Sequence, residues 1–500
     1  MSFLKLALIH SAAEHKQTAR NRDRLLDLFR QAGEAGAQLV VAPEMAVSGY
    51  SFDNRQDIAP YTETASGPTV TALAELARHH GLYACIGLAE RDVRSSIFYN
   101  SAFVLDPQGV LVCRYRKINA EYRWACPGNP RADNTFVTPW GRVGVLICSD
   151  SYHSLLPRIT ALRGADLLLI PANWPPTGLD PREIWRTRAL ENGIVVAACN
   201  RTGMDLVMDC RQGPSAVFDP HGATLLNCSS PDSRLLLVDL HLNADRQLAT
   251  ARRQRLAQRR MADIGDCYLN LAGISDLTSF LRLPPPGRLA IECLVAQSPG
   301  QTIEELTTAP RFGEEQQTLL VLPAGEYGDV ALDRLQTLCA KTGLNIVVYR
   351  EGENAGLYWL DGKGEPRCWP WQRHQPRETA LPRIDCGSAR VLLAPLAALR
   401  HPEPVLAGVK QGCDLVVTSE AHLSADDRLI AGVRTIEGLA VAVCAGNGSG
   451  VWMTPEGHQR WEEVLAGPGE SCRYLLDTHR TRKKRFQDRV DYDRLLANDD

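Results

Sequence analysis

Gly144-Val145-Leu146-Ile147-Cys148-Ser149-Asp150 is an apolar run that ends at a single thiol and continues into residues that commonly begin helices. Such a run predicts a buried strand with the thiol at its end. Two other strand ends lie upstream: the apolar stretch Val40-Val41-Ala42-Pro43-Glu44 ends at a carboxylate, and Arg114-Tyr115-Arg116-Lys117 ends at an ammonium. A thiol, a carboxylate and a lysine at three strand ends are the groups needed to attack a carbon–nitrogen bond. The sequence therefore indicates a reaction class more clearly than a substrate.

Short apolar strands alternate with helical patterns through the first half of the chain. We expect strands at residues 4–9, 38–42, 83–88, 101–105, 143–147, 167–170 and 195–198, and helices at residues 18–35, 69–80, 155–163 and 182–192. Gly81 is well placed to cap the second of these helices. Alternation of this kind predicts an α/β layered fold.

The composition is that of an ordinary globular protein long enough for two domains. The chain has 500 residues, of which 44% are apolar and 23% charged, and its formal net charge is −3. This balance does not support binding to nucleic acid or to an anionic membrane. We interpret the basic clusters Arg252-Arg253-Gln254-Arg255 and Arg480-Thr481-Arg482-Lys483-Lys484-Arg485 as solvated faces near domain ends.

The cysteines and the first residues favour a cytoplasmic protein. The 15 cysteines are scattered and include no C-x-x-C pair, as expected for small buried residues in a reducing compartment. The apolar stretch within residues 1–10 is too short for a signal peptide and predicts a strand. No apolar run approaches the roughly 20 residues that span a bilayer.

The second half of the chain repeats the plan of the first. Gly164-Ala165-Asp166-Leu167-Leu168-Leu169 matches Gly412-Cys413-Asp414-Leu415-Val416-Val417, and Arg188-Ala189-Leu190-Glu191 matches Arg434-Thr435-Ile436-Glu437. The segment ends also agree, because Asp266-Cys267-Tyr268 corresponds to Asp491-Tyr492. We therefore expect an internal repeat of about half the chain.

The two copies are separated by Leu283-Pro284-Pro285-Pro286-Gly287. A run of this composition interrupts the strand and helix pattern and is typical of a linker. We expect a catalytic domain at residues 1–280, a linker at 281–287 and a second domain at 288–500.

The second copy lacks all three reactive groups. Alignment of the copies places Ala394 opposite Cys148, Gln372 opposite Lys117 and Ala324 opposite Glu44. Loss of the three groups together, while the strand pattern persists, predicts an inactive second domain.

The order of Glu44, Lys117 and Cys148 resembles the nitrilase superfamily of carbon–nitrogen hydrolases, and the resemblance covers roughly residues 1–275. It implies α-β-β-α four-layer sandwiches that pair about a two-fold axis. A tandem chain could form this pair internally, as an intrachain pseudo-dimer, with a further homo-oligomer possible. The fold class expected here is therefore α/β, with two tandem sandwiches of the nitrilase type.

The resemblance also assigns roles to residues. It implies that Cys148 is the nucleophile, Glu44 the general base and Lys117 the stabiliser of the oxyanion. Glu121, which precedes Pro127-Gly128, would be the family's second glutamate and would orient the substrate or Lys117. The backbone N–H of Ser149, at the start of the following helix, would donate a second hydrogen bond to the oxyanion. No metal or other cofactor is implied.

The substrate is less well defined. Nitrilases typically follow the cysteine with Trp-Glu, whereas this chain has Ser149-Asp150, which favours an amide or N-carbamoyl substrate over a nitrile. His153 is more readily interpreted as a helix-face residue than as a protease-type base, and both tryptophans could equally be core residues. Together with Ser149, the candidate substrate-binding residues are Tyr50, Tyr122, Trp124, His153, Asn173 and Trp174.

Three other functions stay open. A nitrilase that converts a nitrile to acid and ammonia would use the same three groups. A glutaminase or acyl-transfer subunit would pass ammonia or an acyl group to a partner protein. A non-catalytic ligand-binding scaffold is disfavoured because Cys148, Glu44 and Lys117 are all present.

Overall fold

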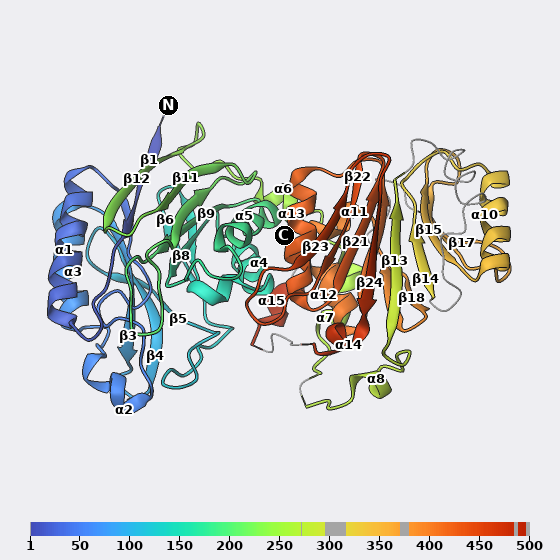
Figure 1. Cartoon of the computed structure of the whole chain (residues 1–500). Coiled ribbons are helices and arrows are strands. Elements are labelled where there is room, and N and C mark those ends of the chain that lie inside the picture. Colours follow the sequence, from blue (N-terminus) through green and yellow to red (C-terminus); the bar gives the residue numbers. More distant parts are fainter. Residues whose placement is uncertain (1, 272, 296–316, 371–379, 485–488, 497–500) are drawn as a thin grey trace. The chain divides into compact units, whose positions relative to one another are not determined.

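The computed structural model describes residues 2–271, 273–295, 317–370, 380–484 and 489–496 (Figure 1). They belong to two compact units: Met1–Gln258 with Arg489–Asp500 form the first, and Arg259–Asp488 form the second. Compactness and sequence duplication are different criteria, so the domain boundary expected at residues 281–287 stays a prediction.

The first unit contains two six-stranded sheets. The first sheet has the strand order β12 (Arg234–His241), β1 (Phe3–His10), β2 (Leu39–Val41), β3 (Tyr83–Arg91), β4 (Phe98–Leu105) and β5 (Leu111–Arg116). The second has the order β11 (Thr224–Ser229), β10 (Pro214–Phe218), β9 (Val195–Asn200), β8 (Leu167–Ala172), β7 (Gly141–Val145) and β6 (Thr135–Thr138). In each sheet the three central strands that pair in parallel are buried and nearly all apolar, as strands covered on both faces should be.

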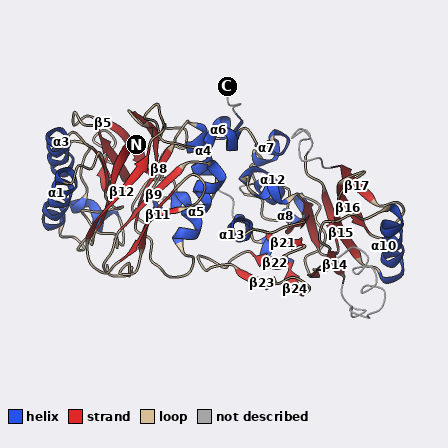
Figure 2. Ribbon diagram, turned by 90° about the horizontal axis from the view of Figure 1, so that it is seen from above, coloured by secondary structure: helices blue, strands red, loops and turns tan. Residues whose placement is uncertain are grey.

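Helices cover the outer faces of these sheets. Helices α1 (Thr18–Glu34) and α3 (Pro68–His80) lie side by side on the first sheet, and α4 (Leu155–Leu162) and α5 (Pro181–Asn192) lie on the second (Figure 2). Helix α1 buries Asn21, Leu25, Phe29 and Ala32, which share one face at helical spacing. The predicted cap of α3 is confirmed, because Gly81 closes it with φ +65°, a left-handed conformation that suits glycine. Short helices α2 (Arg55–Ile58), η1 (Ala59–Tyr61), η2 (Cys148–Ser151) and α6 (Arg252–Leu256) complete the order.

Each sheet of the second unit has the same strand order as its counterpart in the first unit. One sheet runs β24 (Ser471–Asp477), β13 (Arg288–Leu294), β14 (Thr318–Val321), β15 (Asn345–Arg350), β16 (Gly356–Leu360) and β17 (Arg367–Pro370). The other runs β18 (Arg383–Cys386), β19 (Ala389–Leu393), β20 (Leu415–Glu420), β21 (Ala440–Ala445), β22 (Gly448–Met453) and β23 (Glu462–Ala466). The expected α/β fold with two halves of like architecture is confirmed.

Helices again flank this sheet pair. Helix α10 (Asp329–Thr342) packs on one sheet, and α12 (Pro402–Lys410) and α13 (Ala425–Arg434) lie beside the other (Figure 2). Between the two sheets, inward side chains form one buried apolar cluster that includes Leu289, Val321, Val391 and Val417. The remaining short helices are α7 (Met261–Cys267), α8 (Leu277–Phe280), α11 (Leu396–Leu399), η3 (Thr435–Glu437), α14 (Thr478–Arg482) and, in the first unit, α15 (Tyr492–Leu496).

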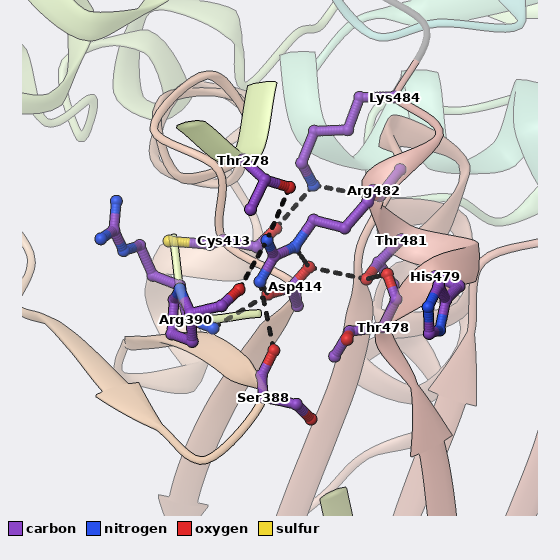
Figure 3. Close-up of polar contacts among 12 residues, drawn as sticks. Thr278, Ser388, Arg390, Cys413, Asp414, Thr478, His479, Thr481, Arg482 and Lys484 are labelled. Atoms are coloured by element: carbon purple, nitrogen blue, oxygen red, sulfur yellow. Dashed lines mark hydrogen bonds and ion pairs between the residues drawn. The ribbon is translucent and has the colours of Figure 1, made fainter. Parts of the chain in front are cut away.

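Asp414 is the centre of a buried polar network in the second unit (Figure 3). Its carboxylate accepts hydrogen bonds from Arg482 Nε at 2.7 Å and Nη2 at 2.8 Å, from Thr481 Oγ1 at 2.7 Å and from the backbone N–H of Arg390 at 2.9 Å. Nearby, Lys484 donates to the Cys413 carbonyl at 2.7 Å, and burial lowers its pKa to about 8. The interpretation of this basic cluster as a solvated face is therefore wrong for Arg482, whose guanidinium binds the buried carboxylate of Asp414.

Asp166 occupies the corresponding place in the first unit. Its carboxylate accepts from the backbone N–H of Arg142 and from Arg252 Nε, both at 3.2 Å. Each of the two matched aspartates thus accepts a hydrogen bond from an arginine of the basic cluster that follows its sheet pair. These arginines were not identified from sequence because a cluster of charges gives no sign of a buried acceptor.

The strand register corrects one step of the sequence alignment. Val145 pairs with Leu169 and Leu393 pairs with Val417, so Cys148 corresponds to Leu396 rather than to Ala394. The alignment failed because 24 residues separate Leu167 from Glu191, but only 22 separate Leu415 from Glu437. Glu44 still corresponds to Ala324, and Gln372, aligned with Lys117, lies outside the described residues.

Within the described part of the chain, no helix combines the length and apolar character needed to cross a membrane.

Candidate active site

The three reactive groups predicted from sequence follow three strands of the first unit. Glu44 lies in the turn after β2, Lys117 directly follows β5, and Cys148 begins η2 after β7. Lys117 Nζ donates to Glu44 Oε1 at 2.7 Å, and both residues are only 1% exposed. The charges of Glu44 and Lys117 act in opposite directions on the pKa of the buried Cys148 thiol, so the three groups form one electrostatic site.

The backbone of Cys148 adopts an uncommon conformation. Its φ of +44° is in the left-handed region, which costs a non-glycine residue free energy and is typical of functional turns. Ser151 Oγ donates to the Cys148 carbonyl at 2.6 Å, and Arg188 Nε donates to the Ser151 carbonyl at 2.8 Å. Trp185 Nε1 adds a bond to Ser151 Oγ at 3.2 Å. The helix expected directly after Cys148 is only the 3-10 turn η2, so its dipole can stabilise an anion less than a long helix would.

The turn that carries Glu44 depends on a glycine in the neighbouring strand. A Cβ atom at Gly87 would lie 2.6 Å from the Cα of Glu44 and 2.6 Å from the Pro43 carbonyl oxygen. Gly87 N–H donates to that carbonyl at 3.1 Å, and its own carbonyl accepts from Ala46 N–H at 2.9 Å. The absence of a side chain therefore allows β3 to hold the Glu44 turn closely. Met45, with φ +51°, completes the turn.

Lys117 is clamped between two carboxylates. It donates to Glu44 Oε1 at 2.7 Å and to Glu121 Oε1 at 2.5 Å. Asn100 Nδ2 bridges the same pair, at 2.6 Å from Glu44 Oε1 and 3.0 Å from Glu121 Oε2. Tyr50 Oη donates to Glu121 at 2.5 Å. The structure therefore brings Glu121 and Tyr50 to the site, and it adds Asn100, which carries no recognisable sequence signal.

Burial and charge set the protonation of these groups. Burial raises the pKa of Cys148 well above its ordinary value, and Glu44 adds to the effect. Burial also raises the pKa of Glu44, although the charge of Lys117 opposes it. Burial disfavours the Lys117 ammonium, but Glu121 and Glu44 outweigh it and raise its pKa. For Glu121, burial acts to raise the pKa, but the charge of Lys117 together with hydrogen bonds from Lys117, Tyr50 and Asn100 lowers it. The site at neutral pH therefore holds a thiol and an ammonium.

Asp150 ties the lysine segment to the cysteine turn. This fully buried carboxylate accepts from Tyr115 Oη at 2.7 Å and from the backbone N–H groups of Asn119 at 2.7 Å and Ile118 at 3.3 Å. It fixes the residues after Lys117 to the residue two positions after Cys148. Tyr115 was missed, although its position two residues before Lys117 places it on the same face of β5.

The predicted substrate-binding residues separate into two groups. Asn173 is buried, and a hydrogen bond from its backbone lowers the pKa of Cys148, which places it beside the Cys148 thiol. Trp174 follows it and packs against Trp185, with ring centroids 5.9 Å apart. Ser149 and His153 flank the cysteine turn, and His153 contacts the ring of Tyr152 at 5.0 Å.

Two other candidates lie elsewhere. Trp124 is 2% exposed and packs with Met45, Phe52 and Ile58 in an apolar cluster behind the Glu44 turn. Tyr122 is 92% exposed. The structure therefore does not bring these two side chains to the reactive groups, and their role in binding stays a prediction.

A loop that sequence reasoning missed adjoins the site. Residues 201–213 connect β9 to β10, and Asp205 in this loop accepts from the backbone N–H of Tyr50 at 2.7 Å. Arg201 Nη1 lies 3.3 Å from Asp205 Oδ2. Cys210 Sγ lies 3.6 Å from Asn173 Oδ1, so the loop contacts both Tyr50 and Asn173. Among the described residues, no group of three His, Cys, Asp or Glu side chains could hold a metal ion.

Known proteins share this half of the chain. The family profile described as Carbon-nitrogen hydrolase matches residues 6–250. A protein of Pyrococcus abyssi named Nitrilase is 30% identical over 247 residues, which cover 48% of this chain and 90% of the relative. Omega-amidase NIT2 of Mus musculus is 30% identical over 279 residues, which cover 53% of this chain and 97% of the relative. The solved structure of the NitN amidase from Neterenkonia sp. AN1 is 25% identical with a TM-score of 0.44, covering 49% of this chain and 94% of its own.

Proposed function

Because the chain belongs to the carbon–nitrogen hydrolase family of the nitrilase superfamily, we propose that it hydrolyses a small carboxamide or N-carbamoyl compound through a thioester on Cys148. The observation that supports this most is the buried clamp in which Lys117 contacts both Glu44 and Glu121. A fully buried lysine with two carboxylates is costly for stability, and such arrangements are typical of functional sites.

The first step is attack by sulfur. Among the described residues, Glu44 Oε2 has no hydrogen-bond partner, so one oxygen of this base is available to take the Cys148 proton. The thiolate sulfur then bonds to the amide carbon while the carbonyl electrons move to oxygen. Proton transfer during attack avoids a free thiolate beside an ionised carboxylate, in agreement with the raised pKa of Cys148.

Lys117 and the backbone N–H of Ser149 stabilise the resulting oxyanion in this mechanism. Two acceptors already hold the Lys117 ammonium, which has three N–H donors, so a third can point at the substrate oxygen. Glu121 receives support from Tyr50 and Asn100 and thereby fixes Lys117. We assign Glu121 to positioning rather than to proton transfer, because Lys117 lowers its pKa.

The second step releases the amine and then the acid. Glu44 returns its proton to the leaving nitrogen as the carbon–nitrogen bond breaks, and ammonia or an amine departs. A water molecule then gives a proton to Glu44 and attacks the thioester carbon. When the carbon–sulfur bond breaks, that proton returns to sulfur and the carboxylic acid leaves.

In our proposal the second half is catalytically inactive. Leu396 and Ala324 replace Cys148 and Glu44 at corresponding positions, and neither side chain can act as a nucleophile or a base. The intrachain pseudo-dimer expected from sequence stays a prediction, since it concerns the arrangement of the two halves.

A nitrilase is the second candidate, because one relative with 30% identity carries that name. The same thiol and base would attack a nitrile carbon. Only the substrate would distinguish the two reactions.

Ammonia release from a panel of amides, ureido compounds and nitriles tests the proposal. We expect release from amides or ureido compounds by the wild type and none by Cys148→Ala. Cys228→Ala is the matched control, since this thiol lies on β11 and is more exposed than Cys148. Release from nitriles alone would identify a nitrilase. No release by folded wild-type protein would contradict the proposal and favour a glutaminase that requires a partner.

A further inference from the structure

The segment at the C-terminal end of each half of the sequence belongs to the compact unit formed mainly by the other half. Helix α7 (Met261–Cys267) follows the first sheet pair in sequence but belongs to the second unit. Helix α15 (Tyr492–Leu496) follows the second sheet pair but belongs to the first unit. These are the segments that match in sequence as Asp266-Cys267-Tyr268 and Asp491-Tyr492.

In the first unit, α15 packs on α4, the helix that follows the cysteine turn (Figure 1). Asp491 Oδ2 lies 2.7 Å from Arg163 Nη2, and both side chains are only 12% exposed. Arg494 donates to the carbonyl of Leu162 at the end of α4. Val490 and Leu495 are buried, so apolar packing accompanies the ion pair.

In the second unit, α7 packs on α12. Gln411 Nε2 donates to Asp266 Oδ1 at 2.9 Å, and Lys410 Nζ donates to the Leu269 carbonyl at 2.6 Å. Gln411 caps α12 as Arg163 caps α4, and the strand register makes these two positions equivalent. Asp491 and Asp266 therefore contact the same position of the fold, each in the unit formed mainly by the other half of the sequence.

Arg163 connects the terminal segment to the strand that carries the nucleophile. Its Nη1 donates to Asn134 Oδ1 at 2.9 Å, and Asn134 Nδ2 donates to the Val145 carbonyl at 2.8 Å. Val145 ends β7, three residues before Cys148. The route from Asp491 to the cysteine strand thus consists of consecutive buried or half-buried hydrogen bonds.

We propose that residues 489–496 form a clasp, supplied by the second half, that holds α4 and β7 in place for catalysis. The corresponding contact in the second unit is that of α7 on α12. The inactive half is then required because it contributes this segment. The expected effect of the clasp on catalysis rests on the hydrolase activity proposed above. Its expected effects on hydrogen exchange in α4 and on binding of the peptide do not.

Removal of residues 489–500 from the full chain tests the clasp. We expect at least a tenfold loss of amide hydrolysis and faster hydrogen exchange of backbone amides in residues 155–163. A synthetic peptide of residues 489–500, added in excess because it lacks the high effective concentration of the attached segment, should bind and restore both properties. A peptide with Asp491→Asn should bind at least tenfold more weakly.

Asp493→Asn is the matched control within the same segment. Asp493 lies 3.0 Å from Arg131, but both side chains are about 70% exposed, so this pair contributes little. In the full chain, Asp491→Asn should accelerate exchange in residues 155–163 and lower kcat, while Asp493→Asn should change neither. Asp266→Asn should accelerate exchange in residues 402–410 and leave residues 155–163 unchanged.

Two results would overturn the clasp: unchanged exchange in residues 155–163 after truncation, or a peptide that does not bind the truncated chain. These readouts need no substrate, so they separate failure of the clasp from failure of the proposed hydrolysis.

Discussion

The turn after β7 in the first half and the turn after β19 in the second half are held by the same kind of arginine contact but begin with different residues. Arg188 Nε donates to the Ser151 carbonyl at 2.8 Å, and Arg434 Nε donates to the equivalent Leu399 carbonyl at 2.7 Å. The arginine that satisfies a buried carbonyl is thus present in both copies. At the first position of the turn, however, the first copy has Cys148 and the second has Leu396. The two copies therefore keep the same scaffold contact and differ at the position of the thiol.

The loops beside these turns differ as well. Residues 201–213 join β9 to β10 in the first half, whereas only Gly446 and Asn447 join β21 to β22 in the second. The longer loop contacts Tyr50 through Asp205, and the two-residue connection of the second copy is too short to form a comparable loop beside its turn. This parallel loss supports a role for the loop in substrate binding.

The largest effect is expected from paired substitutions at the first position of the two turns. Cys148→Ala should reduce ammonia release by about 10⁴-fold or more, because no other group can form the thioester. Leu396→Ala should leave kcat within about twofold and lower the free energy of unfolding by about 2–5 kcal/mol, as for other buried leucines. Denaturant titration and steady-state kinetics on both variants check the pair. A large fall in kcat with Leu396→Ala would show that the second turn takes part in catalysis.

Lys117→Ala should have the next largest effect. Loss of an oxyanion donor typically reduces kcat by about 100- to 1,000-fold. It also leaves Glu44 and Glu121 buried without their shared cation, so the protein should unfold more easily. Single-turnover kinetics at a temperature where circular dichroism shows folded protein separate these effects. Near-normal turnover in folded Lys117→Ala would exclude this role for the lysine.

Substitution of the two matched arginines, Arg188 and Arg434, should separate effects on stability from effects on kcat. Arg188→Gln and Arg434→Gln should each cost about 1–3 kcal/mol of stability, because each leaves a buried carbonyl without its donor. Only Arg188→Gln should also lower kcat, since its carbonyl partner belongs to the turn of Cys148. Thermal unfolding and kcat measured on both variants test this expectation. Equal losses of kcat in the two variants would contradict it.

The smallest expected effect is a shift in the pH dependence of kcat/KM. Glu44 must be ionised to accept a proton, so activity falls as the pH drops through its pKa, which burial raises above the usual 4.5. The Asn100 hydrogen bond opposes this rise, so Asn100→Leu should move the acid limb of kcat/KM to higher pH. Ser101→Ala is the control, because the Ser101 hydroxyl donates a hydrogen bond to Glu90 and not to Glu44. This substitution should not move the acid limb of kcat/KM. An unchanged acid limb in Asn100→Leu would exclude Glu44 as the group that controls it.

Much of this account could be predicted from periodicity and motif order. The strands and helices of the first half follow apolar patterns, Glu44 and Cys148 each end an apolar run, and Lys117 follows a strand, so their convergence could be expected. Asn100 could not be predicted, because a single amide within a strand has no local signal until its partners are known. Gly87 is similar, since its importance comes from the approach of a non-adjacent turn.

Two sequence interpretations failed for physical reasons. Ala394 was aligned with Cys148 because a short difference in loop length cannot be located without strand pairing. The sequence does not indicate that Arg482 is buried, because its partner, Asp414, is far away in the sequence. Both errors concern long-range contacts, which a single sequence does not report.

Mass spectrometry of the intact protein after rapid quenching with a reactive amide, followed by peptide mapping, tests the central claim most directly. We predict one acyl adduct per chain, located on Cys148 and absent from Cys148→Ala. An adduct on a cysteine of the second half, or two adducts per chain, would contradict the division into one active and one inactive copy.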